Sequence, residues 1–303
     1  MGIILAILLF SAIIIIHELG HFLLAKANGI RVDEFSLGLG PTLFGKQFGE
    51  TKFSVKLLPF GGACMMGEDD VEDISEGSFN SKSVWARMSV IVAGPLFNLI
   101  LAWILCMIMI AWVGYRTPVV GGVIDGYSAQ EQGLSEGDVI TKIGGRSVHI
   151  WNDISLYNLT HSEEKEVEIT YKRDGKTHTA VLEPRQKEGD TAPLLGVTGG
   201  KMERPGFFGT LKYGAYTVKY WIDYTVDSLR MLVTGRVGMK DLSGPVGIVS
   251  AVDGVYQEAA PAGLSVIILN LMNIGILITD HNVQESGYHR IKKAWCILRG
   301  LHF

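Results

Sequence analysis

The 303-residue chain is short of charged residues and of cysteines, and each shortage excludes a class of protein. Only 19% of its residues are charged, and the net charge of −4 provides no basic excess for binding nucleic acid. The three cysteines are odd in number, widely spaced and without a C-x-x-C pair: Cys64, Cys106 and Cys296. We therefore expect neither a disulfide framework nor a cysteine-bound zinc site.

In place of charge the chain has apolar residues, which make up 48% of it and cluster in three blocks. The blocks lie near residues 3–27, 89–113 and 260–277, and each approaches the ~20 residues that cross a bilayer as a helix. No basic residue precedes the first block and no A-x-A-like cleavage site follows it, which favours a retained helix over a signal peptide. Residues 116–205 have the composition of a soluble domain.

The first block contains His17-Glu18-Leu19-Gly20-His21. On a helix this spacing places two imidazoles one turn apart on one face, where both can bind Zn²⁺ while Glu18 acts as general base on water. A carboxylate inside a membrane helix costs about 2.5–3.5 kcal/mol on insertion scales, which argues for a function. The motif therefore predicts a zinc protease that cuts within the membrane.

The second block carries Gly94-Pro95-Leu96-Phe97-Asn98. A proline is tolerated in a spanning helix when neighbouring groups satisfy the carbonyl that it leaves without a donor. Asn98 has two possible roles at this depth: a hydrogen bond between helices, or lining of the catalytic site.

The loop between the first two blocks is basic, which predicts the orientation of the chain. By the positive-inside rule this loop is cytoplasmic, the 116–205 domain faces outward, and the zinc motif lies toward the cytoplasm. Seven basic residues support this orientation: Lys26, Arg31, Lys46, Lys52, Lys56, Lys82 and Arg87. In the same loop, the alternation of residues 51–58 predicts a short strand that ends in a turn at Pro59, Gly61 and Gly62.

The soluble domain contains the pattern G-L-x-x-G-D-x-I-x-x-I-x-G over residues 133–145. This pattern resembles PDZ domains of bacterial proteases, which bind an extended peptide as an added strand; a β domain that only fills space is the alternative. Residues 166–171 and 177–182 alternate around Asp174-Gly175, which predicts a hairpin. Residues 206–233 mix aromatic and charged side chains and predict an amphipathic helix at the membrane interface.

In this order, the motifs resemble the site-2 protease family, and in particular its bacterial single-PDZ intramembrane zinc metalloproteases that activate sigma factors. The resemblance covers residues 1 to about 277 and includes Leu242–Ile248 and Leu269–Leu277. It implies a polytopic α-helical membrane protein with a membrane-associated β-hairpin over 51–62 and an inserted α+β PDZ domain. The expected parts are a membrane core over 1–115, the PDZ domain over 116–205, an amphipathic and a membrane helix over 206–277, and an aberrant tail over 278–303.

The resemblance also implies roles for residues. His17 and His21 would bind Zn²⁺, Glu18 would activate water, and Gly61, Gly62 and Asn98 would contact substrate. Substrates would be single-pass membrane proteins already cut by another protease, such as anti-sigma factors or signal-peptide remnants. The enzyme would lie in the bacterial cell membrane, with its PDZ domain as an outward size filter.

The third zinc ligand is missing from the pattern. The family continues from a stretch like Leu269–Leu277 into Asn-Leu-Leu-Pro-x-Pro-x-Leu-Asp-Gly-Gly, whose Asp completes the site. Here the ungapped position is Ser286, no Leu-Asp-Gly occurs nearby, and residues 278–303 carry too many charges for another span. A catalytic zinc needs three protein ligands and water. We therefore expect weak or absent zinc binding and little or no protease activity.

Three explanations remain open: a disrupted reading frame or truncated gene, a natural pseudo-enzyme, or a rearranged site that uses Asp280, His281 or His289. Two other protein classes also remain. One is a non-catalytic membrane adaptor that binds peptides through its PDZ domain. The other is a soluble zinc protease with a signal peptide, which the apolar blocks at 89–113 and 260–277 disfavour.

Overall fold

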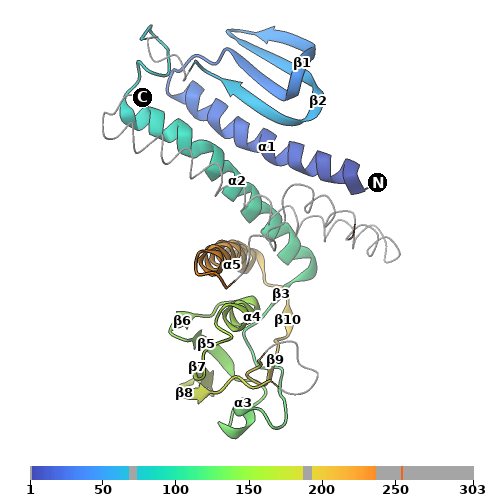
Figure 1. The fold of residues 1–303 in the computed structure, drawn as a ribbon, viewed down its shortest axis with the longest axis vertical. Coiled ribbons are helices and arrows are strands. Elements are labelled where there is room, and N and C mark those ends of the chain that lie inside the picture. Colours follow the sequence, from blue (N-terminus) through green and yellow to red (C-terminus); the bar gives the residue numbers. More distant parts are fainter. Residues whose placement is uncertain (1, 68–73, 187–192, 237–253, 255–303) are drawn as a thin grey trace. The chain divides into compact units, whose positions relative to one another are not determined.

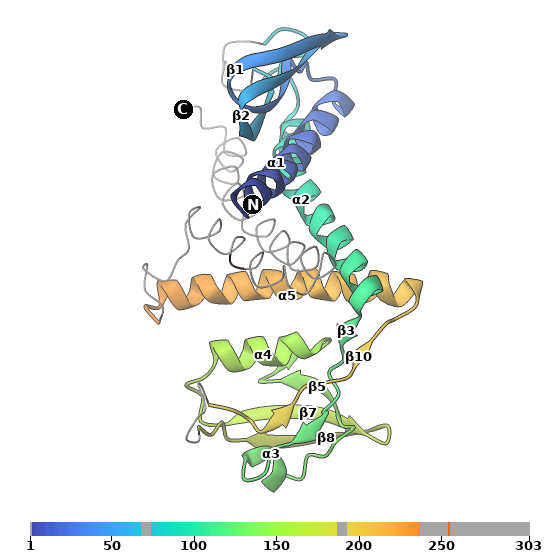
Figure 2. The same ribbon diagram turned by 90° about the vertical axis from the view of Figure 1, so that its right-hand side faces the viewer.

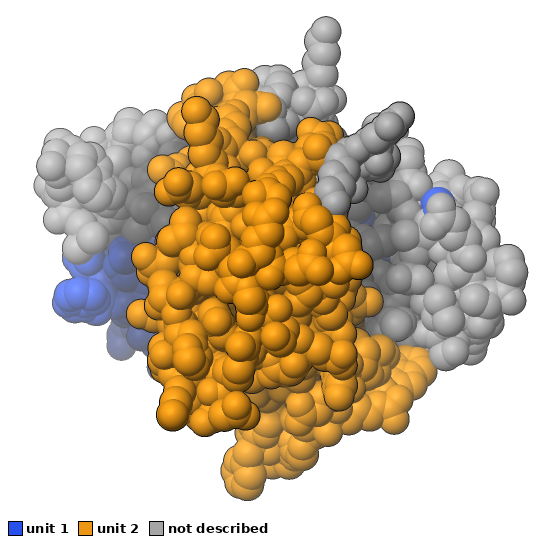
Figure 3. Space-filling model, turned by 90° about the horizontal axis from the view of Figure 1, so that it is seen from below, with its two compact units in different colours: residues 1–105, 240–303 blue, residues 106–239 orange. Residues whose placement is uncertain are grey.

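The computed structural model describes residues 2–67, 74–186, 193–236 and 254, which belong to two compact units. Figure 3 colours them separately: one comprises Met1–Leu105 and Lys240–Phe303, the other Cys106–Met239. The predicted third membrane helix over 260–277 and the tail over 278–303 lie outside the described residues. We describe each unit by itself.

Two long apolar helices dominate the first unit. Helix α1 spans Gly2–Ala27 and helix α2 spans Val84–Val113 (Figure 1). Both are long and apolar enough to cross a membrane. Helix α2 begins five residues before the predicted start, because the Ser83 hydroxyl accepts a hydrogen bond from the Ala86 N–H and caps the first turn.

The loop between these helices forms an extended hairpin, which the sequence predicted too short and with the wrong turn. Strand β1 spans Glu34–Phe48 and strand β2 spans Thr51–Met65. The turn lies at Gly49, whose φ is 61°, a value that glycine adopts without strain. The predicted turn at Pro59 is instead part of β2, in the stretch where that strand bends back along β1.

The bend lets the beginning of β1 pair twice with β2. Residues Glu34–Leu37 lie between two stretches of β2, Lys52–Val55 on one side and Gly62–Met65 on the other. Within the first unit the curled sheet packs on α1 (Figure 1), and Cys64 of β2 contacts Glu18 of that helix. One edge of the sheet is therefore the stretch Gly62–Met65.

The second unit contains a four-stranded antiparallel sheet in the order β6-β5-β7-β8. Its strands are Val139–Ile143 (β5), Arg146–Ser147 (β6), Val167–Arg173 (β7) and Lys176–Leu182 (β8). The pairing of β7 with β8 around Asp174 confirms the predicted hairpin. Two helices accompany the sheet, Ser128–Glu131 (α3) and Trp151–Thr160 (α4). Four two-residue strands form two separate pairs, β3 (Tyr115–Arg116) with β10 (Met202–Glu203) and β4 (Gly122–Val123) with β9 (Val197–Thr198).

The predicted amphipathic helix forms as α5, Phe207–Val233, and runs beside α4 (Figure 2). Aromatic rings attach one face of it: Tyr213 stacks on Tyr115 at 3.8 Å between ring centroids, and Tyr216 meets the edge of His149 at 3.9 Å. Another set of apolar side chains on α5 is exposed: Phe207, Phe208, Ile222, Val226, Leu229 and Val233. The helix is therefore two-sided, as its sequence predicted.

Candidate metal site

The metal motif lies where α1 passes close to α2, and a glycine on α1 permits the approach. A Cβ atom at Gly20 would lie 2.5 Å from the carbonyl oxygen of Ala93, closer than real Cβ atoms come to any atom. The absence of a side chain thus allows the two backbones to meet beside His17 and His21. The glycine of H-E-L-G-H is consequently a packing requirement of this helix pair.

The two histidines converge on a second glycine, on α2. His17 and His21 are 8% and 1% exposed, and their ring centroids lie 4.8 Å apart. A Cβ at Gly94 would lie 2.6 Å from His17 Nε2 and 2.3 Å from His21 Nε2. Both Nε2 atoms therefore border the same small space, which exists because residue 94 has no side chain. Two imidazole nitrogens facing one space are a donor set that Zn²⁺ favours.

The other nitrogen of each ring lies against α2. His21 Nδ1 is 2.7 Å from the carbonyl oxygen of Val90, and His17 Nδ1 is 3.2 Å from Asn98 Nδ2. Asn98 is fully buried. Of the two roles that the sequence left open for this residue, the structure contains the hydrogen bond between helices.

Glu18 lies against the edge of the sheet. Its Oε2 accepts a hydrogen bond of 3.1 Å from the Cys64 N–H on β2, and a Cβ at Gly62 would lie 3.5 Å from Glu18 Cγ. Gly62 is thus next to the motif. Gly61 faces elsewhere, since a Cβ there would meet the Leu39 side chain at 2.8 Å. The structure brings together all the predicted residues except Gly61.

The described part of the chain supplies two candidate metal ligands and not three. Among these residues no group of three His, Cys, Asp and Glu side chains could hold a metal ion. The histidines fit Zn²⁺ by burial and by the direction of their Nε2 atoms. The alternative ligands Asp280, His281 and His289, and the aligned Ser286, lie outside the described residues.

Two groups beside the motif could not be predicted from the sequence, the Val90 carbonyl and the Cys64 N–H. Both belong to the backbone, so no residue type could have indicated them. Gly94 has a signal in the sequence, because it precedes Pro95 inside an apolar helix. A glycine there weakens the helix by roughly 1 kcal/mol relative to alanine, which indicates that the position needs the absence of a side chain.

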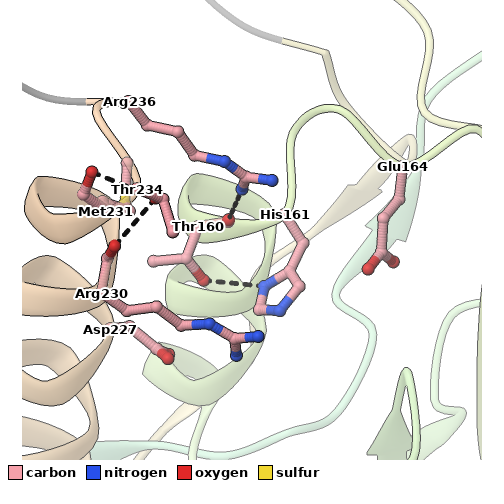
Figure 4. A pocket seen from close by; sticks show the side chains of 8 residues that line it. All are labelled: Thr160, His161, Glu164, Asp227, Arg230, Met231, Thr234 and Arg236. Carbon is pink, nitrogen blue, oxygen red and sulfur yellow. Dashed lines mark hydrogen bonds between the residues drawn. The ribbon is translucent and has the colours of Figure 1, made fainter.

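A second candidate site is the polar cavity between α4 and α5 (Figure 4). Its lining residues are Thr160, His161, Glu164, Asp227, Arg230, Met231, Thr234 and Arg236. Asp227 accepts two hydrogen bonds from Arg146, of 2.5 and 3.1 Å, and Arg236 pairs with Glu163 at 3.1 Å. These pairs tie α5 and the segment after it to the domain, which is a structural role.

Residues 5–282 match the model of Peptidase family M50. A protein of Clostridium acetobutylicum whose name places it among the zinc metalloproteases is 38% identical over 262 residues, 86% of this chain and 76% of that protein. The "Regulator of sigma-W protease RasP" of Bacillus subtilis is 29% identical and covers 98% of this chain and 94% of its own length.

Among solved structures, a PDZ domain of the SdrC-like protein from Listeria monocytogenes matches 28% of this chain and 88% of its own length. The sequence identity is 28% and the TM-score is 0.23.

Proposed function

The chain belongs to Peptidase family M50, the site-2 protease family, and on this basis we propose that it is built as a zinc endopeptidase that cuts within the membrane. One observation carries the proposal. His17 and His21 direct their Nε2 atoms into the same small space beside Gly94, with Glu18 on the intervening turn of the same helix. This arrangement lies between two helices that are apolar enough to span a bilayer.

Each residue of the motif has a role in this mechanism. His17 and His21 hold Zn²⁺ through Nε2, while their Nδ1 atoms remain against α2. Zinc, when bound, supplies Lewis acidity toward water and a peptide carbonyl. Glu18 takes a proton from the attacking water and gives it to the leaving amine. The Cys64 N–H holds the Glu18 carboxylate in place until substrate arrives.

We further propose that substrate binds as an extended strand along the sheet edge Gly62–Met65. This edge lies against Glu18, and a peptide added there would present its backbone to the motif. Gly62 has no side chain to obstruct the approach. Exposed apolar residues on the hairpin suit a membrane-embedded segment: Leu39, Leu43, Phe44, Phe48, Leu57 and Leu58.

The substrate class we propose is single-pass membrane proteins already cut by another protease. The relative RasP is named as a regulator of sigma-W, which fits a substrate of the anti-sigma-factor type. The basic loop between the helices would be cytoplasmic in a bacterial cell membrane. The 116–205 domain would then face outward as a PDZ-type filter that admits shortened substrates.

The 303-residue chain itself should bind zinc weakly and cleave little, because a third ligand of the family's kind is missing after Leu277. The test is a reporter substrate co-expressed with this chain and with a variant in which the family's Asp-containing segment replaces residues 278–303. We expect cleavage only with the variant, and loss of that cleavage on Glu18→Gln. Cleavage by the unaltered chain, abolished by Glu18→Gln, would show that another residue completes the site.

The adaptor alternative predicts a different outcome. Purified adaptor would bind extracytoplasmic peptides through the 116–205 domain and retain no zinc that depends on His17 and His21. Zinc lost on the double substitution His17→Asn/His21→Asn supports the enzyme. Peptide binding without any such zinc supports the adaptor.

A further inference from the structure

Three residues on one face of α2 lie against the two histidines of α1. Val90, Gly94 and Asn98 follow one another at intervals of four, so they lie along one side of the helix. Val90 contacts His21, Asn98 contacts His17, and Gly94 leaves the space between them. Each histidine thus has its Nδ1 fixed by a different residue of α2.

A neutral imidazole that binds a metal through Nε2 carries its proton on Nδ1 and needs an acceptor there. The Val90 carbonyl oxygen is such an acceptor for His21, at 2.7 Å. For His17 the atom at 3.2 Å is Asn98 Nδ2, which is a donor, while Asn98 Oδ1 is buried and without a hydrogen-bond partner among the described residues. The two ends of this amide are exchanged by a half-turn of the side chain, and their assignment follows from the hydrogen bonds.

We propose that Asn98 is a positioning residue for the zinc ligand His17: its Oδ1 accepts the Nδ1–H hydrogen bond and leaves the Nε2 lone pair directed at the space beside Gly94. This proposal rests on the proposed function, since it concerns how the motif is prepared for zinc. It extends that function because it assigns to a residue of α2 the orientation of a zinc ligand on α1. The half-turn supplies the buried Oδ1 with a donor and His17 with an acceptor.

The position of Asn98 suits this task better than direct contact with substrate. The side chain is fully buried, and its amide is within hydrogen-bonding distance of His17. Because both side chains are buried between α1 and α2, a hydrogen bond from this amide to His17 also fixes the orientation of the ring.

The experiment compares Asn98→Asp, which keeps an oxygen acceptor, with Asn98→Leu, which keeps the size and removes both polar atoms. The first readout is the tautomer of His17 in zinc-free protein, measured by ¹⁵N NMR of histidine-labelled full chain and assigned with His17→Gln. We expect the Nδ1–H tautomer in the natural chain and in Asn98→Asp, and loss of that preference in Asn98→Leu. Ser89→Ala, which alters a neighbouring polar residue of α2, should leave the His17 signal unchanged.

The second readout is zinc affinity, measured by competition with a chelator in the same detergent. We expect a loss of roughly 10–100-fold in Asn98→Leu and a change of less than about threefold in Asn98→Asp. An Nε2–H tautomer in the natural chain, or equal effects of Asp and Leu on the tautomer, would overturn the assignment. If the zinc that the natural chain holds does not depend on His17 and His21, the proposed function fails, while the tautomer measurement still decides the role of Asn98.

Discussion

The helix pair α1–α2 and the β domain (residues 116–205) differ in the polar side chains that they bury and in the apolar side chains that they expose. In α1 and α2 the polar groups His17, His21 and Asn98 are inside. Large apolar residues of α2 are exposed at intervals of four: Val92, Leu96, Ile100, Ile104, Ile108 and Trp112. In the β domain the interior is apolar, with Ile140, Ile169 and Leu182 fully buried. The difference fits two helices that are long and apolar enough to cross a membrane, and a domain with an ordinary apolar core.

The charged pairs of the β domain are of two kinds. Asp138, which is buried, accepts hydrogen bonds of 2.7 Å from two nitrogens of Arg173. Arg185 donates two hydrogen bonds to Glu131 at the surface, where such a pair contributes little by itself. On α1, polar residues inside a helix this apolar are costly if it spans a bilayer, which supports the functional role that we propose for them.

The largest effect should come from emptying the core of the β domain. Ile169→Ala removes a fully buried side chain from β7 and should cost about 2–5 kcal/mol. Hydrogen exchange of the β5 and β7 amides in the full chain measures the loss. The matched change Ile100→Ala, on the exposed side of α2, should leave those amides unchanged. Equal loss of exchange protection in the two variants would contradict the view that the β domain has an apolar core while α2 carries apolar side chains on its exposed side.

A charge on the outer side of α2 should be nearly as costly. Ile104 is 41% exposed and lies near the centre of the second apolar helix, so Ile104→Lys should reduce insertion by about 2.5–3.5 kcal/mol. A glycosylation-site assay in membranes reports the inserted fraction. Glu168→Lys, on an exposed position of β7, serves as the control and should insert normally. Normal insertion of Ile104→Lys would mean that this side of α2 does not contact lipid.

The close approach of the helices can be tested at Gly20. A Cβ atom would lie 2.5 Å from the Ala93 carbonyl oxygen, so Gly20→Ala should destabilise the helix pair by about 1–3 kcal/mol. Thermal unfolding of the full chain in detergent measures this. Gly206→Ala is the control, since nothing lies within 4 Å of its added Cβ. A melting temperature no lower than that of the control would place α1 farther from α2 than we describe.

The smallest effect concerns pH and the β domain alone. Burial raises the pKa of Asp138, but hydrogen bonds from Arg173 and from the Ser135 N–H lower it more, so the net pKa lies below its usual value. The carboxylate therefore stabilises the folded domain above about pH 4, and this contribution is lost as the pH falls through the lower, folded-state pKa. Exchange protection of β5 should fall from pH 5 to pH 3 more steeply in the natural chain than in Asp138→Asn. Identical slopes would refute this role.

Sequence predicted the helices and the β7–β8 hairpin well because each rests on local information. Uninterrupted apolar runs indicate long helices, and Asp174-Gly175 between two alternating segments indicates a tight turn. The spacing of His17 and His21 likewise indicated a shared helical face. These signals are carried by the residues that form the element.

Sequence failed where structure depends on distant contacts. The β1–β2 sheet has Glu34 paired with both Lys52 and Met65, which no alternation pattern expresses. Proline and glycine usually end strands, so the sequence predicts a turn at Pro59, Gly61 and Gly62. In the structure these residues lie within β2, where the strand bends. The partners of His21 and Glu18 are backbone groups of Val90 and Cys64, and any residue type could have supplied them.

Equilibrium zinc binding to the purified full chain, set against His17→Asn/His21→Asn, tests the central claim most directly. That claim is that α1 and α2 together form a metal site inside an apolar helix pair. The account predicts one weakly held zinc per chain that a chelator removes and that the double variant does not bind. Zinc retained equally by the double variant would contradict it.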